Sequence, residues 1–378
     1  MPDSRAPLPH GFPDGFGEGP READAVLVLR CLLGITPRDL FALIWRVGGA
    51  SAACTAILQG SAGSDHDRAF LAGADPGAIR DRIGAAGARF AAPGDPEYWP
   101  AFLRLADPPV GIFVRGQPLA DGHDRVALVG SRRPTPTGRE VATHLARGLA
   151  AAGVVVVSGG AVGIDAAAHR GALDAGGSTV AVLGSGIDVD YPPSNGRLLR
   201  AVEQGGTIVG EYAPGVPAEP FRFPARNRLI AALSRGIVVV QGASRSGTRI
   251  TAEHALELGL DVFAVPGSVT DPLAETPLDM IREGATMIRD ADDLLLDLGI
   301  DPQRATDPDA LPGLPAAQRS LLEALAAPML PDAVARAAGV PVSDAISALV
   351  ELELRGLVRG VGGRYERTFR AAPQRGSS

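Results

Sequence analysis

The sequence of 378 residues contains no lysine, so all 36 of its basic side chains are arginines. A P-loop nucleotide site needs a lysine against the phosphates, and Schiff-base catalysis needs a lysine amine. Both classes are therefore excluded. Cysteine is nearly absent as well. Cys31 and Cys54 match no metal-binding or redox spacing, and we interpret them as buried free thiols.

Long apolar runs are also missing. No stretch approaches the roughly 18–20 apolar residues that span a bilayer, and residues 1–20 lack the apolar core of a secretory signal. These absences predict a cytoplasmic protein. Residues 1–20 are rich in proline and glycine and are predicted to be a disordered lead-in. The net charge of −7 counts against a surface that attracts nucleic acid everywhere, but it leaves room for a local basic patch.

What is present divides the chain into regions. Residues 21–92 are predicted to form a helical domain, with short helices and Gly/Pro turns of the helix-hairpin-helix kind up to residue 60 and alanine-rich helix beyond it. Residues 93–298 are predicted to form an α/β core that begins with an irregular passage over 93–124. A Pro/Asp-rich linker is expected over 299–315, and a disordered tail over 371–378.

Within the core, apolar runs alternate with helical stretches from Val126 onward. This alternation predicts a parallel sheet that is covered by helices on both faces. The predicted strands are 126–130, 154–158, 179–184, 207–210, 236–241 and 261–267. In the helical stretch 139–151, Val141, Leu145 and Leu149 share one face, and His144 is expected to be solvated. Ligands of such sheets bind beyond the carboxyl ends of the strands.

The loop after the second predicted strand is rich in glycine and raises the question of a nucleotide cofactor. It carries Gly159, Gly160 and Gly163. A dinucleotide fingerprint would need a glycine at Ser158 and an acidic residue at the end of the next strand, where Leu183 and Gly184 stand. We therefore predict no cofactor. A glycine turn with free N–H groups at a helix N-terminus still suits a phosphate.

Asp165 and His169 lie four residues apart on the helix that follows this loop, and two interpretations are open. The two side chains could meet as an acid–base pair. Alternatively, Asp165 stabilises the helix N-terminus while His169 packs or hydrogen-bonds locally, which is the interpretation we favour. Nothing nearby in the sequence suggests a nucleophile.

Arginines concentrate around the predicted strand ends. Six lie between Pro220 and Ala252 and four lie between Arg125 and Arg139, with no carboxylate in either segment. Pairing with distant carboxylates is expected for Arg235 or Arg249 but not for the whole set. Small and hydroxyl residues recur in three further strand-end loops, 130–138, 184–195 and 241–253. Phe221 and Phe223 interleave with the arginines and are candidates to stack on nucleic-acid bases.

A series of motifs in this region, from about Pro93 to Leu296, resembles that of the DprA/Smf family (DNA-processing protein A). It begins with VGSR at 129–132 and SGGA at 158–161, which is followed by GID and AH. The later members are AVLGSGIDVDYPPSN, FPARNRLIAALS, SGTRITAEHALELG and VFAVPG, in the order that the family has. Two departures are Gln241, where the family has an acidic residue, and 276–285, which lacks an expected asparagine.

The resemblance implies an extended Rossmann-like parallel sheet with helices on both faces. It also implies an N-terminal SAM-like helical domain, a C-terminal winged-helix domain and a homodimer formed through the core. The implied function is to bind and protect single-stranded DNA and to help load a RecA-type recombinase in natural transformation and recombination, with no catalytic residue and no metal. The family's DNA pocket maps onto Gly130, Ser131, Arg132, Phe223, Arg226, Asn227 and Arg228. The glycine-rich loops add Ser158, Gly159, Gly160, Ser246 and Gly247 as predicted phosphate-binding residues.

An enzyme of the same superfold is the alternative. The LOG-type nucleotide phosphoribohydrolases carry P-G-G-x-G-T-x-x-E, in which the glutamate performs the chemistry. Here Thr251 stands in the place of that glutamate, and Glu253 comes two residues later. A phosphate cradle without its catalytic carboxylate favours a binding protein. A pure scaffold is a third class, and it would not bind an oligonucleotide.

Residues 316–370 have the winged-helix pattern of three helices and a hairpin that turns at Gly362-Gly363. In such domains the third helix, here 343–355, usually enters the major groove. That helix carries Asp344, Glu351, Glu353 and only one basic residue, Arg355. The wing adds Arg359, Arg364, Arg367 and Arg370. Because carboxylates repel a polyanion, we predict that this domain contacts protein or its own core and is not the main DNA site.

Overall fold

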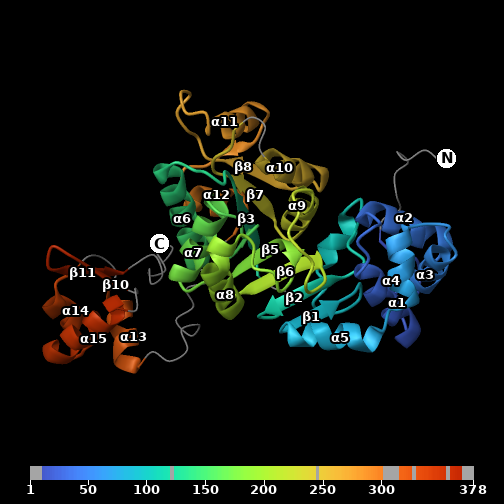
Figure 1. Cartoon of the computed structure of the whole chain (residues 1–378). Coiled ribbons are helices and arrows are strands. Elements are labelled where there is room, and N and C mark those ends of the chain that lie inside the picture. The colour runs from blue at the N-terminus through green and yellow to red at the C-terminus, as the bar shows by residue number, and fades with distance from the viewer. Residues whose placement is uncertain are drawn as a thin grey trace.

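The computed structural model describes residues 11–119, 123–243, 247–300, 315–325, 329–354 and 358–367. The predicted tail 371–378, residues 301–314 of the predicted linker and the first ten residues of the predicted lead-in lie outside these ranges. Along the chain, a group of helices precedes a large sheet, and a smaller group of helices with a hairpin follows it (Figure 1).

Five short helices form the N-terminal part. They are α1 (Pro20–Arg30), α2 (Pro37–Val47), α3 (Ala50–Leu58), α4 (Asp65–Ala72) and α5 (Pro76–Ala85). Side-chain caps start several of them: the Thr36 hydroxyl accepts from the Asp39 N–H, and Ser64 forms a capping box with Asp67. Leu29, Phe41 and Ile44 meet in a core of their own.

The predicted disordered lead-in is wrong for residues 11–19. Phe12 stacks on Phe16 with ring centroids 4.2 Å apart and meets the edge of Phe41 at 5.2 Å. The Trp45 indole N–H donates to the Gly11 carbonyl at 2.9 Å. Two phenylalanines and one hydrogen bond thus hold a segment whose composition alone suggested disorder.

The central sheet has nine strands in the order β1-β2-β6-β5-β4-β3-β7-β8-β9. Their bounds are β1 Ala88–Ala91, β2 Ile112–Gly116, β3 Arg125–Val129, β4 Val155–Ser158, β5 Thr179–Gly186, β6 Thr207–Tyr212, β7 Gly236–Val239, β8 Asp261–Ala264 and β9 Thr286–Met287. The six predicted strands correspond to β3 to β8, and they pair in parallel throughout. The predicted parallel Rossmann-like sheet is confirmed.

The sheet continues beyond the prediction on both sides. β1 falls in a stretch expected to be helical, and β2 falls in the passage expected to be irregular. These two strands pair with each other, and β2 also pairs with β6, in both cases in antiparallel fashion. β1 reads Ala-Arg-Phe-Ala and has no β-branched residue, so its strand conformation depends on pairing with β2 rather than on local propensity. β9 has only two residues and was not expected either.

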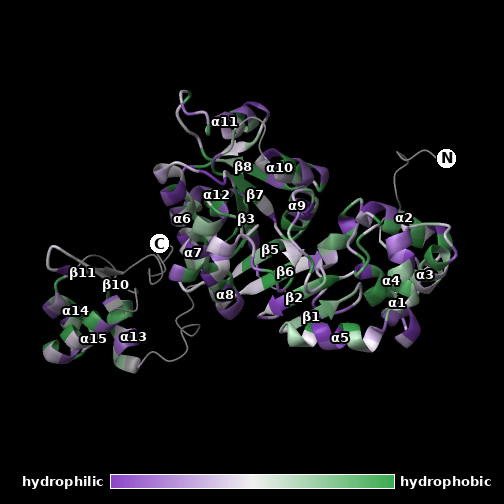
Figure 2. Ribbon diagram, viewed as in Figure 1, coloured by the Kyte–Doolittle hydropathy of each residue, from purple (hydrophilic) through white to green (hydrophobic). Residues whose placement is uncertain are grey.

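Helices cover both faces of the sheet, as predicted. They are α6 (Pro136–Ala151), α7 (Ile164–Asp174), α8 (Gly196–Gly205), α9 (Arg222–Ala232), α10 (Gly247–Glu257), α11 (Glu275–Arg282) and α12 (Ala291–Asp297). Alternate residues of β3 face opposite cores: Val126 and Leu128 pack with α6 and α7, whereas Ala127 and Val129 pack with α9. Hydrophobic residues fill the central strands, and hydrophilic residues gather on the outer helices (Figure 2).

The apolar stripe predicted on α6 is confirmed. Leu145 and Leu149 are fully buried, Val141 packs partly against the same core, and His144 is exposed. Within the described part of the chain, no single helix is long and apolar enough to cross a membrane. Two sharply bent helix pairs pass that test by length and composition only.

The C-terminal part contains α13 (Ala316–Ala324), α14 (Pro331–Ala338) and α15 (Val342–Leu354), followed by a hairpin of β10 (Val358–Val361) and β11 (Arg364–Arg367). Gly362 and Gly363 form the predicted turn, with φ angles of 59° and 76°. Leu321, Val334 and Leu349 belong to a separate core. The winged-helix prediction is confirmed.

Candidate nucleic-acid interface

The loops that follow the central strands surround a hollow of about 490 Å³ at the carboxyl edge of the sheet. Many of the predicted site residues line it: Gly130, Ser131, Arg132, Phe223, Arg226, Asn227 and Gly247. They come from the loop after β3, from α9 and from the start of α10. We call this feature the strand-end hollow. Ser246, also predicted, lies outside the described residues.

Close backbone contacts tie the loops together. The Ser131 N–H donates to the Gln241 carbonyl at 2.7 Å, and the Ile164 N–H donates to the Ser131 carbonyl at 3.1 Å. Gly163 has a φ of 88°, and a Cβ there would lie 2.3 Å from the Ser131 oxygen. Only glycine fits both the backbone angle and the contact. The loop after β3 is therefore fixed against the start of α7.

Arg226 occupies the floor of the hollow with only 4% of its surface exposed. Its Nη1 donates to the Gly159 carbonyl at 2.6 Å and also to the Val182 carbonyl, and its Nε donates to Asn227 Oδ1 at 3.0 Å. Burial lowers the pKa of Arg226 to about 10, although the nearby Asp165 carboxylate opposes this shift. Arg226 thus links the end of β4 to the middle of β5 and places positive charge in the floor of the hollow.

Asp165 and His169 have separate partners. Asp165 Oδ2 accepts from the Ala161 N–H at 3.3 Å, and its burial raises the pKa of its carboxyl while the charge of Arg226 lowers it. His169 Nδ1 lies 2.7 Å from the Thr179 hydroxyl, which donates to the Val156 carbonyl. Burial lowers the pKa of His169 to about 3. The local interpretation is confirmed, and no acid–base pair forms between these two residues.

Aromatic rings and a guanidinium form the exposed side of the hollow. The Phe223 ring stacks on Tyr191 with centroids 5.2 Å apart and planes 28° apart. The Arg132 guanidinium carbon lies 5.1 Å from the Phe223 centroid, in a cation–π contact. Tyr191 is 41% exposed. Phe221, the other candidate ring, is 65% exposed and contacts Arg222.

Tyr191 was not among the predicted site residues. It lies in the loop 184–195, which the sequence marked as a strand-end loop, but no local pattern shows that its ring reaches Phe223. The chain has only four tyrosines, so an aromatic residue in a strand-end loop was the one feature of the sequence that could have suggested Tyr191 as a site residue.

As expected, pairing with carboxylates does not extend to the whole set of clustered arginines, but it reaches beyond Arg235 and Arg249 to more of them than a local count of charges suggests. Every described arginine of the 220–252 segment has a partner: Arg222 with Glu219, Arg226 with two carbonyls, Arg228 with Glu211 and Asp107, Arg235 with Asp124, and Arg249 with Glu253 and Glu283. The partners include carboxylates far away in sequence, which a local count of charges misses. In the 125–139 segment Arg132, Arg133 and Arg139 are exposed.

Four predicted residues are buried and do not line the strand-end hollow. Ser158 is fully buried, and its hydroxyl donates to the Leu128 carbonyl at 2.7 Å. Gly159 and Gly160 are buried too, and their carbonyls accept from Arg226 and from Asn195 Nδ2. Arg228 is 3% exposed and points into the protein. These residues support the loops that form the hollow.

Arg228 is the centre of a buried ionic network. Its Nη1 and Nη2 donate to the two oxygens of Glu211 at 2.5 and 2.9 Å, and its Nε donates to Asp107 at 3.0 Å. Arg30 of α1 lies 3.6 Å from the same Glu211 carboxylate. Burial would raise the pKa of Glu211, but the charges of Arg228 and Arg30 and the hydrogen bonds from Arg228 hold it below its ordinary range. The network joins the N-terminal helices to the sheet.

Gln241 shows how one departure from the family pattern fits this chain. Its Oε1 accepts from the Thr135 N–H at 3.0 Å, and its Nε2 donates to the Thr135 hydroxyl at 3.0 Å. The same Nε2 donates to Asp271 at 3.3 Å. A carboxylate in place of Gln241 could not donate this hydrogen bond and would repel the Asp271 carboxylate. The neutral amide therefore fits the presence of Asp271 in the neighbouring loop.

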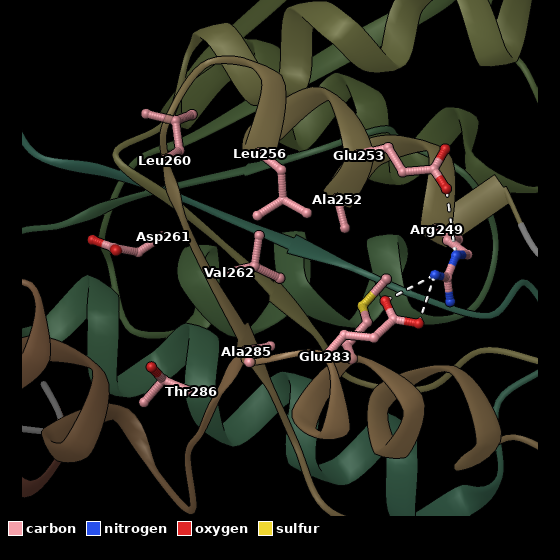
Figure 3. A pocket seen from close by; sticks show the side chains of 12 residues that line it. Arg249, Ala252, Glu253, Leu256, Leu260, Asp261, Val262, Glu283, Ala285 and Thr286 are labelled. Atoms are coloured by element: carbon pink, nitrogen blue, oxygen red, sulfur yellow. Dashed lines mark hydrogen bonds and ion pairs between the residues drawn. The ribbon is translucent and has the colours of Figure 1, made fainter.

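The carboxylate that the enzyme alternative would use lies elsewhere. Thr251 is buried at the edge of the strand-end hollow, with its hydroxyl directed at the Gly247 carbonyl. Glu253 instead lines a second hollow of about 240 Å³, where Arg249 bridges Glu253 at 3.4 Å and Glu283 at 2.8 Å (Figure 3). Among the described residues, no three His, Cys, Asp or Glu side chains gather as a metal site would require.

The core is a Rossmann-like α/β domain, because its sheet is mostly parallel, is covered by helices on both faces and has a hollow at the carboxyl edge of its central strands. A winged-helix domain follows this core in the chain. Residues 89–299 match the family described as DNA recombination-mediator protein A, and residues 305–364 match the DprA winged helix domain. The chain belongs to the DprA family.

Individual relatives agree with this assignment. Protein Smf of Escherichia coli K12 is 38% identical over 294 residues, which cover 74% of this chain and 77% of that protein. A putative DNA processing protein DprA of Mycobacterium tuberculosis H37Rv is 42% identical over 63% of each chain.

Two solved structures are similar as well. DprA of Streptococcus pneumoniae has a TM-score of 0.58 and 31% identity, covering 73% of this chain and 97% of that one. DprA of Helicobacter pylori, whose structure describes a mode of single-stranded DNA binding, has a TM-score of 0.51 and 30% identity, covering 56% and 97%.

The substitution Glu211→Gln is expected to lower the free energy of unfolding by about 3 kcal/mol, because it leaves the buried charge of Arg228 without its main counter-ion. Urea unfolding at neutral pH measures this loss. Since folding lowers the pKa of Glu211, its contribution is present above the ordinary value of 4.5 and is lost as the pH falls through the lower folded value. The difference in the free energy of unfolding between Glu211→Gln and wild type should therefore become smaller at acidic pH.

The matched exchange Glu253→Gln removes a carboxylate from the exposed Arg249 pair and should leave stability nearly unchanged. Equal effects of the two exchanges would contradict a structural role for the buried network.

Proposed function

We propose that this protein binds single-stranded DNA at the strand-end hollow, without strong sequence specificity. The observation that carries the proposal is the group of exposed Arg132, exposed Tyr191 and half-buried Phe223 beside a hollow with a buried guanidinium in its floor. Proteins that hold single strands combine a positive groove with rings on which bases stack. The H. pylori relative, whose structure describes such binding, supports the same ligand here.

In this proposal, the arginines and the aromatic residues contact different parts of the DNA strand. The exposed guanidiniums of Arg132 and Arg133 bind phosphate oxygens, and backbone N–H groups of the loops assist them. Phe223 and Tyr191 offer a preformed aromatic surface to the bases, whose faces all stack without regard to sequence. Arg226 contributes positive charge from below while its hydrogen bonds keep the loops in place. No covalent chemistry is needed for this function.

We extend the proposal to protection of incoming single strands and to loading of a RecA-type recombinase in transformation and recombination, which family membership supports. We also propose that the core forms a homodimer. The exposed apolar side chains of Leu256 (64%) and Met287 (48%) near the β9 edge of the sheet are compatible with a protein contact there.

Arg132→Ala is expected to weaken binding to all single-stranded sequences about equally, since its guanidinium contacts phosphate rather than base edges. The slope of log K against log salt should become shallower by about 0.7 for the one phosphate contact that is lost. Fluorescence anisotropy with labelled oligonucleotides across salt concentrations measures both effects. Arg147→Ala is the control, because it removes an exposed arginine of α6 that pairs with Asp174 of α7. It should change neither the affinity for DNA nor the slope against salt. Identical affinities of all three proteins at moderate salt would overturn the DNA assignment.

Nucleoside monophosphates and ATP should be neither hydrolysed nor deglycosylated above background. The place of the catalytic glutamate holds Thr251, and Glu253 is engaged in the second hollow. Chromatography of the incubated nucleotides tests this expectation. Turnover that Glu253→Ala abolishes would instead favour the phosphoribohydrolase alternative.

Truncation after Pro312 should leave single-strand affinity within a few-fold of the full-length value, because the proposed site lies wholly in the core. The separate segment 316–378 should bind duplex DNA no more tightly than non-specific binders do, with Kd of about 10⁻⁴–10⁻⁶ M. Mobility shifts measure both affinities. Loss of most of the single-strand affinity on truncation would show that the winged-helix domain carries the site.

A further inference from the structure

Helix α9 contributes one of its faces to the strand-end hollow. Phe223, Arg226, Asn227 and Ile230 all line the hollow. Their positions along α9 follow the spacing that places residues on one side of a helix. A shift of α9 would therefore move a ring and a guanidinium of the proposed DNA site together.

Two other arginines of α9 are buried and do not line the hollow. Arg228 donates to both oxygens of Glu211 at 2.5 and 2.9 Å. The Arg222 guanidinium carbon lies 5.0 Å from the centroid of the Tyr212 ring. Glu211 and Tyr212 are the last two residues of β6. An ion pair and a cation–π contact thus attach α9 to the end of this strand.

Arg30, at the end of α1, contacts the same two residues of β6. Its Nη1 lies 3.6 Å from Glu211 Oε1, and its guanidinium carbon lies 5.8 Å from the Tyr212 centroid. Arg30 is 4% exposed and Glu211 is 1% exposed, so water does not screen their attraction. Leu27 and Val28 of α1 pack in the core cluster that contains Tyr212, so α1 is held against the sheet independently of Arg30.

We propose that Arg30 is a positioning residue for the strand-end hollow. By holding Glu211 and Tyr212, it lets the N-terminal helices set the position of α9, and thereby the DNA affinity of a site to which they contribute no lining residue among those described. This inference rests on the proposed function for the identity of the ligand. It goes further because it gives the N-terminal helices a part in binding.

The balance of charge explains why Arg30 matters to α9. Two guanidiniums, of Arg30 and Arg228, face two carboxylates, of Glu211 and Asp107. Loss of Arg30 leaves one guanidinium for both carboxylates. An unbalanced charge in a buried site favours movement of the charged groups toward water. Arg228 belongs to α9, so its movement displaces the helix that carries Phe223 and Arg226.

Arg30→Gln in the full-length protein tests the proposal with two measurements, of which one needs no DNA. Hydrogen exchange followed by mass spectrometry should show faster amide exchange in α9, Arg222–Ala232, than in wild type. Fluorescence anisotropy should show single-strand affinity reduced by about fivefold or more. The slope of log K against log salt should stay unchanged, because no phosphate contact is lost. Arg30→Lys keeps a positive charge beside Glu211 and should restore most of the affinity.

Two control variants separate this role from general effects. Arg80→Gln makes the same exchange in an exposed pair with Asp24, between α5 and α1. Leu29→Ala removes a fully buried side chain from the separate core of the N-terminal helices and leaves the contacts of Arg30 in place. Both variants should keep wild-type exchange in α9 and wild-type DNA affinity at temperatures where urea unfolding shows them to be folded.

Several outcomes would overturn the proposal. One is wild-type DNA affinity in folded Arg30→Gln, whether or not exchange in α9 is faster. Another is an equal loss of affinity in Arg30→Gln and Leu29→Ala, which would assign the effect to general destabilisation of the N-terminal helices. Absence of DNA binding by the wild-type protein would instead contradict the proposed function. In that case, unchanged exchange in α9 of Arg30→Gln would separately contradict the link between Arg30 and α9.

Discussion

The hydrogen bonds of Arg226 are the constraint on which the strand-end hollow depends. From a position on α9, its guanidinium connects the carbonyl of Gly159, directly after β4, with that of Val182 in the middle of β5. A Cβ on Gly159 would lie 2.4 Å from Arg226 Nη2 and 2.7 Å from Asp165 Oδ2, so the glycine, the arginine and the carboxylate fit only as a set. A buried guanidinium keeps its charge because its pKa remains far above neutral. The same side chain thus holds the backbone around the hollow and places a positive charge in its floor.

Arginine performs two distinct tasks in a chain without lysine. Arg226 and Arg228 are buried and bind several defined oxygens through the rigid planar fork of the guanidinium, a geometry that the rotating ammonium of lysine does not offer. Arg132 is exposed and lies over a ring, where it remains available to a ligand. The buried groups hold the surrounding backbone in place, whereas Arg132 contacts the Phe223 ring at the surface. The net charge of −7 indicates neither the buried nor the exposed role of these arginines.

Much of the fold could be predicted from the sequence, because β3 to β8 are apolar runs separated by amphipathic helices. The edge strands could not, since β1 has weak propensity and owes its conformation to pairing with β2. The place of the strand-end hollow followed from topology, as the carboxyl ends of parallel strands meet at one edge. The pairing of Arg228 with Glu211 and Asp107 could not be predicted, because those partners stand 17 and 121 residues away. The same holds for the contact of Tyr191 with Phe223, which only the folded loops create.

Mapping the contact between DNA and protein tests the central claim most directly. A single-stranded oligonucleotide that carries iodouracil can be crosslinked to the full-length protein by light, and the modified peptides can be identified by mass spectrometry. Stacking on the aromatic surface predicts crosslinks at Phe223 on α9 or at Tyr191 in the loop after β5. Crosslinks confined to the winged-helix domain, or to the hollow around Arg249 and Glu283, would contradict the assignment of the strand-end hollow as the DNA site.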